Sequence, residues 1–457
     1  MSLIGAIFNK TVDSYQEAFR ACDITSDWMK KAIEDWFELY FMKDASTTED
    51  PCQQIPYTIV RKLTKAVFSE YKATGKDEFV QRILDALSDK SQDALQLALI
   101  GGESKLKPVP TQTGFRFNVI SRHNIMVFGR DDDGNMTDIG TAASCTQGKF
   151  YYTLLERRTV NANGYLTIRN SLYRSLSRDS LGQRVSLQSL PQYADLPDEY
   201  TFTKPVGSIG IIGLRTPMVN CVDSTADAVS VYAAAAGLIH NINRNEAQIN
   251  GEFERGESRI VVSADMLRKD DKTGTKVIKD HIFVGLDEDP ETVGFNIFSP
   301  ALREQSFLAR KQEYLRNVEN VIGLKRGLLS DVEAAERTAK EITSSEGEYN
   351  LTVIDFQKMW ENTVREAVRV CGILGQMYKV PGAHEVAEDA VTIDWGNGVL
   401  FDEEKTWADY KDMVSRGLLK PEIALGWRFN MPTKTEADLA KIRKTLMPIQ
   451  AEEPEEE

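Results

Sequence analysis

The sequence predicts an α+β protein in which blocks of helix and blocks of antiparallel strand follow one another. Three observations lead to this class. Apolar residues recur every three or four positions in several long segments, which is the spacing of one face of a helix. Residues 105–175 instead look like strands joined by Asp-Gly and Asn-Gly turns. A shorter strand-like block at 258–300 separates two of the helical segments.

Composition excludes several classes of protein. The chain has 457 residues, of which 42% are apolar and 27% charged, so a packed core is expected. The formal net charge of −14 argues against a protein that coats nucleic acid with a basic face. No run of about 18 apolar residues occurs, so no membrane span is expected. Residues 1–10 lack the pattern of a signal peptide.

Residues 1–100 are predicted to be helical. Ser26 is placed to cap a helix, because serine at this position accepts a hydrogen bond from a free backbone N–H. The apolar positions of that helix step by four, three, one and three: Met29, Ile33, Trp36, Phe37 and Tyr40. Two further helices are expected near 55–73 and 76–100, the second ending at Gly101-Gly102.

Antiparallel strands are expected over 105–175, with hairpin turns at Asp133-Gly134 and Asn163-Gly164. The acidic run that precedes Gly134 does not have the glycine spacing of a calcium loop, so we interpret it as a solvated hairpin tip. Residues 176–224 are rich in Ser, Pro and Gly and are predicted to form a loop-rich connection.

A long helix is predicted over 225–257. Its apolar positions step by four, seven and four: Leu238, Ile242, Ile249 and Phe253. The second half of the segment is mostly polar, so the helix is exposed or lies in an assembly. A second helix is predicted over 301–322, and the two should run antiparallel with the β-rich insertion at one end.

The remaining chain is predicted to be mainly helical. Apolar positions from Val353 to Leu374 follow a regular helical period, with Gly372 as the candidate position for a bend. A strand is expected at VTIDWGNG. Short helices are predicted at 404–417, 419–426 and 433–446, followed by an acidic, disordered tail.

No catalytic, metal-binding or cofactor-binding motif is found. The sequence lacks a Walker A loop, a GxSxG elbow and an HExxH pair. The five scattered cysteines are interpreted as buried, reduced thiols, and the four histidines are too far apart for a metal site. A group of carboxylates would suit a hydrolase, although a solvated helix start explains them better: Asp394, Asp402, Glu403, Glu404 and Asp409.

The order of these elements resembles the portal proteins of tailed bacteriophages, of the long-tailed, siphophage type. INGEFERGESRIVVSADML resembles the end of the family's first stem helix, and VENVIGLKRGLLSD with ERTAKEITSSEGEYNLTV resembles its second stem helix and tunnel loop. KTWADYKDMVSRGLLKPEIALGWRFNM is similar to the family's C-terminal helices. KFYYTLLE and TIRNSLYRS are similar to its N-terminal half, so the resemblance covers nearly the whole chain.

The resemblance implies a portal fold with a helical and β-rich wing, a two-helix stem, a small β-rich clip, a long kinked helix, and a crown that is small or absent. In chain order the implied parts are wing 1–224, stem helix 225–257, clip 258–300, stem helix 301–322, tunnel-loop region 323–349, long helix and wing return 350–400, crown base 401–446, and acidic tail 447–457.

The resemblance further implies a ring at one capsid vertex of the virion, assembled in the host cytoplasm. Such a ring has twelve copies in the virion, with thirteen as an alternative for the isolated protein. It forms the channel through which double-stranded DNA is packaged and ejected. The implied partners are the terminase large subunit, head–tail connector or adaptor proteins, and the major capsid and scaffolding proteins. No membrane, cofactor or enzymatic activity is implied.

Three groups of candidate residues follow from the resemblance. Those expected beside DNA are Lys325, Arg326, Glu336, Arg337, Lys340 and Glu341. Those expected to contact terminase or connector proteins are Arg268, Lys269, Lys272, Lys276, Lys279, Asp287 and Glu288. Those expected in stem oligomerisation are Ala233, Ala236, Leu238, Ile242, Ile249, Phe253, Phe307, Tyr314 and Val318. For the basic residues, ordinary solvated side chains remain the alternative.

Two other functions remain open at this point. One is a different phage head or tail protein, such as an adaptor or capsid component. The other, from a different class, is a cytoplasmic hydrolase that uses the carboxylates near residues 394–409.

Overall fold

The structure is a computed structural model of the chain. It describes residues 12–41, 51–255, 303–331, 339–387, 390–396, 403–429, 431–433 and 435–447, together with four strands between 259 and 298. Of those strands, and of residues 12–13, 255, 339–348 and 403–406, the backbone alone is described. The chain forms two compact units, one of Met1–Thr64 with Gly75–Ala390 and one of Lys65–Thr74 with Val391–Glu457.

The N-terminal part of the chain is helical, as expected. Its helices are α2 (Val12–Phe19), α3 (Asp27–Phe41), α4 (Ile55–Val67) and α5 (Glu78–Gly101). The predicted cap is confirmed, because the Ser26 hydroxyl accepts a hydrogen bond from the Met29 N–H at 3.1 Å. Gly102, with φ of 84°, ends α5. Helix α4 ends at Val67, earlier than predicted, because Lys72–Gly75 forms strand β1.

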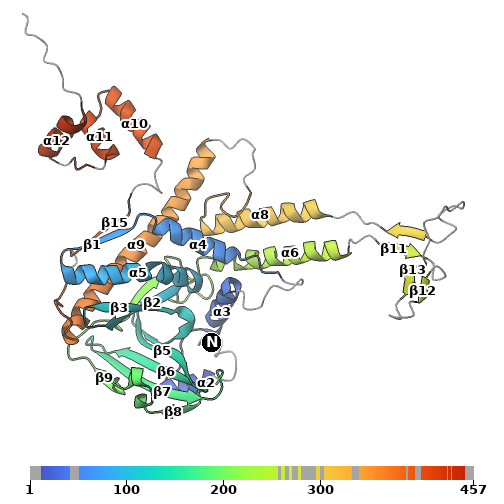
Figure 1. Ribbon diagram of the computed structural model, residues 1–457, viewed down its shortest axis with the longest axis horizontal. Coiled ribbons are helices and arrows are strands. Elements are labelled where there is room, and N and C mark those ends of the chain that lie inside the picture. The colour runs from blue at the N-terminus through green and yellow to red at the C-terminus, as the bar shows by residue number, and fades with distance from the viewer. Residues whose placement is uncertain are drawn as a thin grey trace, which may run out of the picture. The chain divides into compact units, whose positions relative to one another are not determined.

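Two antiparallel sheets form the β-rich part of the first unit. One has the order β10-β2-β3, with bounds Ile212–Arg215, Glu103–Pro110 and Phe115–Ser121, and α5 packs on it (Figure 1). The other has the order β4-β5-β6-β7-β8, with β9 also paired to β7. Its strands are Ile125–Arg130, Met136–Gln147, Phe150–Val160, Leu166–Ser175, Gln183–Val185 and Glu199–Thr201.

The hairpin turns predicted from the sequence are present. Gly134 and Gly164 both adopt positive φ, at 81° and 78°. The Asp131 carboxylate accepts hydrogen bonds from the backbone and side chain of Asn135, so it belongs to the turn itself. The region 176–224 is mostly irregular, as expected, but it also contributes the short strands β8, β9 and β10.

The helix predicted over 225–257 is shorter than expected. A 3₁₀ turn (Ala233–Ala235) leads into α6 (Ala236–Arg255), and residues 225–232 are not helical. The physical reason is that this stretch makes its hydrogen bonds to other elements. The Val231 N–H and the Ser230 hydroxyl both donate to the Leu99 carbonyl, at 2.9 and 3.0 Å, and Thr216 donates to the Val229 carbonyl at 2.6 Å.

The insertion between the two long helices contains two strand pairs. Strand β11 (Arg259–Val262) pairs antiparallel with β14 (Phe295–Phe298). Strand β12 (Leu267–Lys269) pairs antiparallel with β13 (Lys276–Ile278). The β character predicted for 258–300 is therefore present at these positions.

Two helices follow the insertion. Helix α8 spans Glu304–Ile322, close to the predicted bounds, and α9 spans Ala339–Met377, which begins earlier than the apolar pattern indicated. Helix α9 is continuous across Gly372. A Cβ at this position would lie 2.8 Å from the His384 carbonyl oxygen, so the glycine allows the following segment to approach closely. The glycine thus has a packing role, whereas the sequence pattern indicated a bend.

The second unit combines segments from distant parts of the sequence. Strand β1 pairs with β15 (Val391–Asp394), and the Trp395 ring packs 5.0 Å from that of Tyr71. Three short helices complete the unit: α10 (Glu403–Ser415), α11 (Pro421–Arg428) and α12 (Glu436–Leu446). Thr435 and Asp438 form a capping box at the start of α12. Of the predicted tail, 447–457, all residues but Met447 lie outside the described part of the chain.

The cysteines differ from the prediction. All five are free thiols, but Cys371 alone is buried, whereas Cys22 and Cys221 are exposed. Cys22 lies in the irregular segment between α2 and α3 and Cys221 in a turn, so neither belongs to the core. No helix in the described part of the chain is long and apolar enough to cross a membrane.

Candidate functional site

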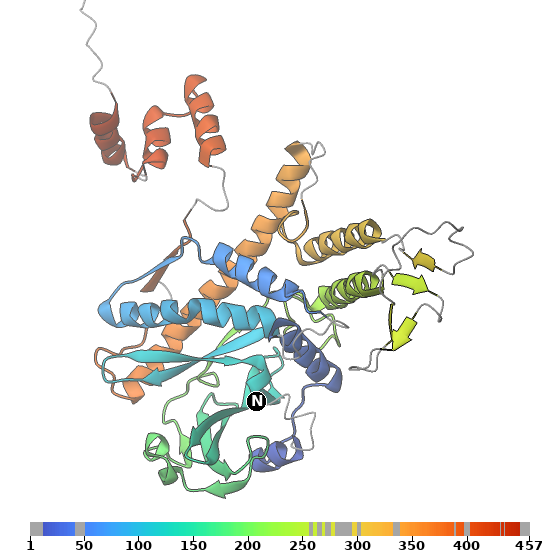
Figure 2. The same cartoon turned by 45° about the vertical axis from the view of Figure 1, so that its right-hand side comes forward.

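Helices α6 and α8 lie side by side and run in opposite directions (Figures 1 and 2). Three polar contacts fix their register. Glu246 pairs with Lys311 at 2.7 Å, and Glu252 pairs with Arg303 at 2.9 Å. The Asn245 side-chain amide also donates to the Phe307 carbonyl at 3.1 Å. The two ion pairs run in opposite order along the helices, since the later residue of α6 meets the earlier residue of α8, which confirms the predicted antiparallel arrangement.

One face of this helix pair is apolar and buried within the chain. It is formed on α6 by Ile239, Ile242 and Ile249 and on α8 by Leu315, Val318 and Ile322. Beyond this buried stretch the same helices carry exposed apolar side chains, and two of them stand at helical spacing from buried ones: Phe253 from Ile249 and Leu308 from Leu315. Phe253 is 46% exposed, Leu308 44% and Val321 49%. Large apolar groups left exposed on paired helices are typical of a surface that another chain covers.

The residues predicted for stem oligomerisation divide into two groups. Ile242, Ile249 and Val318 are buried, so they hold α6 and α8 to the chain's own core. The other six are partly or fully exposed: Ala233, Ala236, Leu238, Phe253, Phe307 and Tyr314. Only this second group is accessible to a neighbouring chain.

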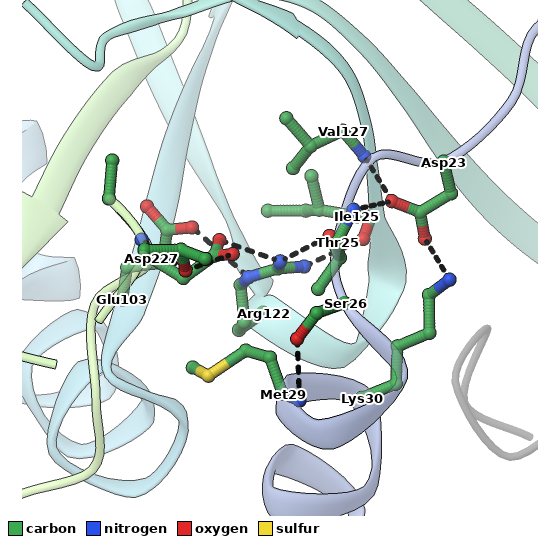
Figure 3. A network of polar contacts seen from close by, with 12 residues as sticks. Asp23, Thr25, Ser26, Met29, Lys30, Glu103, Arg122, Ile125, Val127 and Asp227 are labelled. Atoms are coloured by element: carbon green, nitrogen blue, oxygen red, sulfur yellow. Dashed lines mark hydrogen bonds and ion pairs between the residues drawn. The ribbon is translucent and has the colours of Figure 1, made fainter. Parts of the chain in front are cut away.

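A buried polar network holds the segment that leads into α6 (Figure 3). Arg122, only 1% exposed, lies between two carboxylates, with its guanidinium 3.2 Å from Glu103 and 3.2 Å from Asp227. The same guanidinium donates to the Thr25 hydroxyl at 3.0 Å and to the Ile125 carbonyl at 2.9 Å. One side chain therefore links four parts of the chain: the segment before α3, the two sheets, and the segment just before α6.

The carboxylate of Asp227 is shared by a second arginine. Arg130 of β4 contacts it at 2.6 Å and also donates to the Gly134 carbonyl at 2.7 Å. Nearby, Ser26 donates to Asp223, and the Asp223 carboxylate also accepts from Asn220 at 2.7 Å. These contacts hold residues 220–227, which we call the strap, in an irregular conformation, so the strap does not form the first turns of α6.

Charge compensation keeps Glu103 ionised although it is fully buried. Burial alone raises the pKa of this carboxyl, but the positive charges of Lys105, Arg122, Arg215 and Arg130 outweigh it and hold the pKa at about 2. Lys105 lies 3.1 Å from the Glu103 carboxylate. A buried carboxylate with this many cationic neighbours is a structural ion pair rather than a proton donor at neutral pH.

The chain after α8 folds into a tight turn, residues 323–331, which we call the α8 turn. Gly323, with φ of 76°, ends the helix. The buried Glu319 carboxylate then accepts hydrogen bonds from the backbone N–H groups of Gly327, Leu329 and Ser330, at 3.1, 2.5 and 3.0 Å. Lys325 and Arg326, which were predicted to lie beside DNA, are exposed on this turn.

The other predicted DNA-channel residues are described less fully. Lys340 and Glu341 lie in the first turn of α9, with their backbone alone described. Glu336 and Arg337 lie outside the described residues.

The residues predicted for terminase or connector contact fall in the insertion. Arg268 and Lys269 are on β12, and Lys276 is on β13, directly opposite Lys269. The other four lie outside the described residues: Lys272, Lys279, Asp287 and Glu288.

Glu319 and Arg122 are not among the functional residues predicted from the sequence. A signal for Glu319 was present, because it stands in the apolar stripe of α8 beside Val318 and Ile322, where a charge has no ordinary place. Arg122 gives no comparable signal, since its partners Glu103 and Asp227 are distant in the sequence.

The described side chains among the carboxylates considered for a hydrolase do not form a site. Asp394 is exposed and accepts the Gly396 N–H at 2.9 Å, and Asp409 is exposed on α10. The side chains of Asp402, Glu403 and Glu404 are outside the described part. Among the described residues, no group of three or more His, Cys, Asp or Glu is placed to hold a metal ion.

Comparison with known proteins gives a fold relationship. No protein-family model and no curated protein matches the chain. Among solved structures, the chain is similar to one from the neck of a native GTA particle, computed with C12 symmetry. The two are 11% identical with a TM-score of 0.50, over 93% of this chain and 100% of the other. The α+β fold is therefore shared with a neck chain of that particle.

Arg122 is expected to be essential for the stability of the first unit. Replacement Arg122→Gln leaves Glu103 and Asp227 buried with too few partners, which costs about 3–5 kcal/mol in the free energy of unfolding. Urea unfolding of the purified protein measures this. The matched control is Arg169→Gln, because the Arg169–Glu199 pair is more than half exposed and contributes about 0–1 kcal/mol. Equal losses in the two variants would contradict the central role of Arg122.

Glu103 is expected to make stability depend on acid pH. Its pKa in the folded state, about 2, is lower than the value of about 4.3 in an unfolded chain. The stabilisation from this shift is therefore complete above about pH 5 and declines as the pH falls toward 2. Urea unfolding from pH 7 to pH 3 should show the wild-type advantage over Glu103→Gln shrinking with acidity. The control is Glu199→Gln, for which the difference in unfolding free energy from wild type is not expected to shrink with acidity.

Proposed function

We propose that the chain is a portal protein of a phage-like particle: one subunit of a closed ring at a capsid vertex, around a channel for double-stranded DNA. The observation that carries this proposal is the fold similarity to a neck chain, which extends over 93% of this chain, in a particle computed with C12 symmetry. The paired helices with a β insertion between them, found independently in the sequence and the structure, support it.

The surface of the helix pair suits ring formation. Rings form when one face of each subunit contacts a different face of the next, and the rotation closes. The exposed parts of α6 and α8 combine charged residues with the exposed side chains of Phe253, Leu308 and Val321. In the proposed ring these exposed parts meet the helix pairs of the two neighbours.

The charge of the chain also suits a channel for DNA. Each phosphate contact made by Lys or Arg adds affinity, so a basic channel would hold DNA and resist sliding. The net charge of −14 per chain argues against such retention. The exposed residues Lys325 and Arg326 would then supply a limited set of phosphate contacts.

The proposal assigns a part to each segment. The wing comprises 1–224 with 350–400, the stem comprises α6 and α8, and the clip is the insertion at 258–300. The tunnel loop lies within 323–349, and α10 to α12 form a small crown base. The partners proposed for the clip are the terminase large subunit during packaging and connector proteins afterwards. Capsid and scaffolding proteins surround the wing in the virion, after assembly in the host cytoplasm.

The first test is the mass of the purified protein by light scattering and its shape by single-particle imaging. Twelve copies of 51.4 kDa give a ring of about 617 kDa with a central hole, and thirteen copies add one further subunit. A stable monomer that does not assemble even with scaffolding protein present would contradict the proposal. A small oligomer with hydrolytic turnover would favour the hydrolase instead.

A pair of variants tests whether the helix pair forms the ring contact. Leu308→Asp introduces a charge at an exposed apolar position of α8 and is expected to abolish the ring while leaving the subunit folded. The matched control is Leu176→Asp, since Leu176 is 71% exposed beyond the end of β7. Rings that form equally well with both variants would place the subunit contact elsewhere.

The clip proposal is tested by reversing its charge. The triple change Arg268→Glu, Lys269→Glu and Lys276→Glu is expected to abolish capture of terminase in a pull-down, with rings of normal mass. The matched control reverses three exposed basic residues of the first unit: Lys149, Arg178 and Arg184. Loss of capture in the control as well would indicate a general charge effect rather than docking at the clip.

A further inference from the structure

We propose that Glu319 is the positioning residue that fixes Lys325 and Arg326 in place on the α8 turn, so that each subunit presents this basic pair to DNA in a constant geometry. The proposal that the pair meets DNA rests on the channel function proposed above. The anchoring by Glu319 rests on contacts within the chain alone.

The carboxylate of Glu319 is the centre of the α8 turn. It is fully buried, and its Oε1 atom accepts hydrogen bonds from the N–H groups of Gly327, Leu329 and Ser330. Its Oε2 atom accepts a hydrogen bond from the Ser330 hydroxyl at 2.8 Å. One side chain thus satisfies four donors of a segment that lies eight to eleven residues further along the chain.

The chemistry explains why a glutamate occupies this position. A charged side chain in an apolar stripe is unfavourable unless hydrogen bonds replace the lost water. Backbone N–H groups that converge on one point form an anion-binding concavity, and Glu319 fills it from within the chain. Hydrogen bonds to an ionised acceptor are stronger than those between neutral groups, so the turn is held firmly.

Other contacts support the turn from three sides. On α8, Gln312 exchanges two hydrogen bonds with Asp331, each 2.8 Å. On α9, the Thr352 hydroxyl donates to the Gly323 carbonyl at 3.2 Å. On α4, Lys62 donates to the Leu328 carbonyl. The turn therefore has a defined position relative to three helices.

The basic pair lies on the part of the turn that these contacts leave accessible. Leu324 and Ser330 are each 6% exposed and face inward, whereas Lys325 and Arg326 are exposed. In a symmetric ring this arrangement places the same two cations at the same height in every subunit. The contacts of this pair with passing phosphates then depend on the anchored backbone of the turn.

The first experiment tests the anchoring in the full-length ring. Glu319→Gln keeps the shape of the side chain but removes its charge, and hydrogen exchange of the backbone amides is compared with wild type. The amides of Gly327, Leu329 and Ser330 are expected to exchange at least about tenfold faster, which corresponds to about 1.4 kcal/mol. The matched control is Glu313→Gln, because Glu313 is exposed on the same helix.

The second experiment tests the consequence for DNA. Linear duplex DNA is driven by voltage through rings held in a solid-state pore, and the passage time is measured. Lys325→Ala with Arg326→Ala is expected to shorten the passage, since phosphate contacts are lost. Glu319→Gln should shorten it as well. Adding Glu319→Gln to the double variant should have no further effect, because Glu319 acts only through that pair.

The outcomes distinguish the anchoring of the turn by Glu319 from the contact of the basic pair with DNA. Unchanged amide exchange in Glu319→Gln overturns the anchoring. Additive effects of Glu319→Gln and the double variant on passage time overturn the positioning role, even if exchange increases. If the double variant itself passes DNA like wild type, the contact of this pair with DNA is wrong. Should Glu319→Gln fail to assemble, Ser330→Ala removes the Oε2 bond alone and is tested in the same way.

Discussion

The arrangement of the first unit depends on the buried guanidinium of Arg122. Four elements far apart in the sequence meet at this group, and each supplies it with a hydrogen bond or a carboxylate. An arginine is suited to this role because its planar fork donates in several fixed directions at once. Since one of its partners is Asp227, the network also determines where the chain leaves the core and where α6 can begin. The position of the helix pair is thus a consequence of a buried ion cluster and not of helix propensity.

The same principle appears where the chain leaves α8, at the same end of the helix pair, because Glu319 organises the turn that follows. In both places a buried charge is compensated by several donors or acceptors, and an irregular segment supplies at least one of them. Regular elements supply their own backbone hydrogen bonds, whereas irregular segments must obtain them from side chains. The two charges therefore give fixed geometry to the strap before α6 and to the turn after α8, which are the two connections between the helix pair and the rest of the unit.

Periodicity in the sequence predicted most of the regular elements correctly, including the antiparallel helix pair, the hairpin turns and the three C-terminal helices. The errors occur where long-range contacts override local preference. Residues 225–232 have a helix-compatible sequence, but they form hydrogen bonds with Leu99 and Thr216 and remain irregular. The first two residues of β1 were assigned to a helix, and the strand was missed because its partner β15 is more than half the chain away. Glu319 interrupts an apolar stripe, but most of its partners are backbone groups, which cannot be recognised from a sequence.

The pairing of β1 with β15 has a consequence for how the chain acquires its structure. The second unit is assembled from residues 65–74 and residues from 391 onward, so its small sheet is closed by a contact of very high sequence separation. On a ribosome, the early strand is synthesised long before its partner. The first unit can therefore reach its core packing before the second is complete. Contacts of this kind form late and slowly, so the small sheet closes only after the chain has been translated as far as β15.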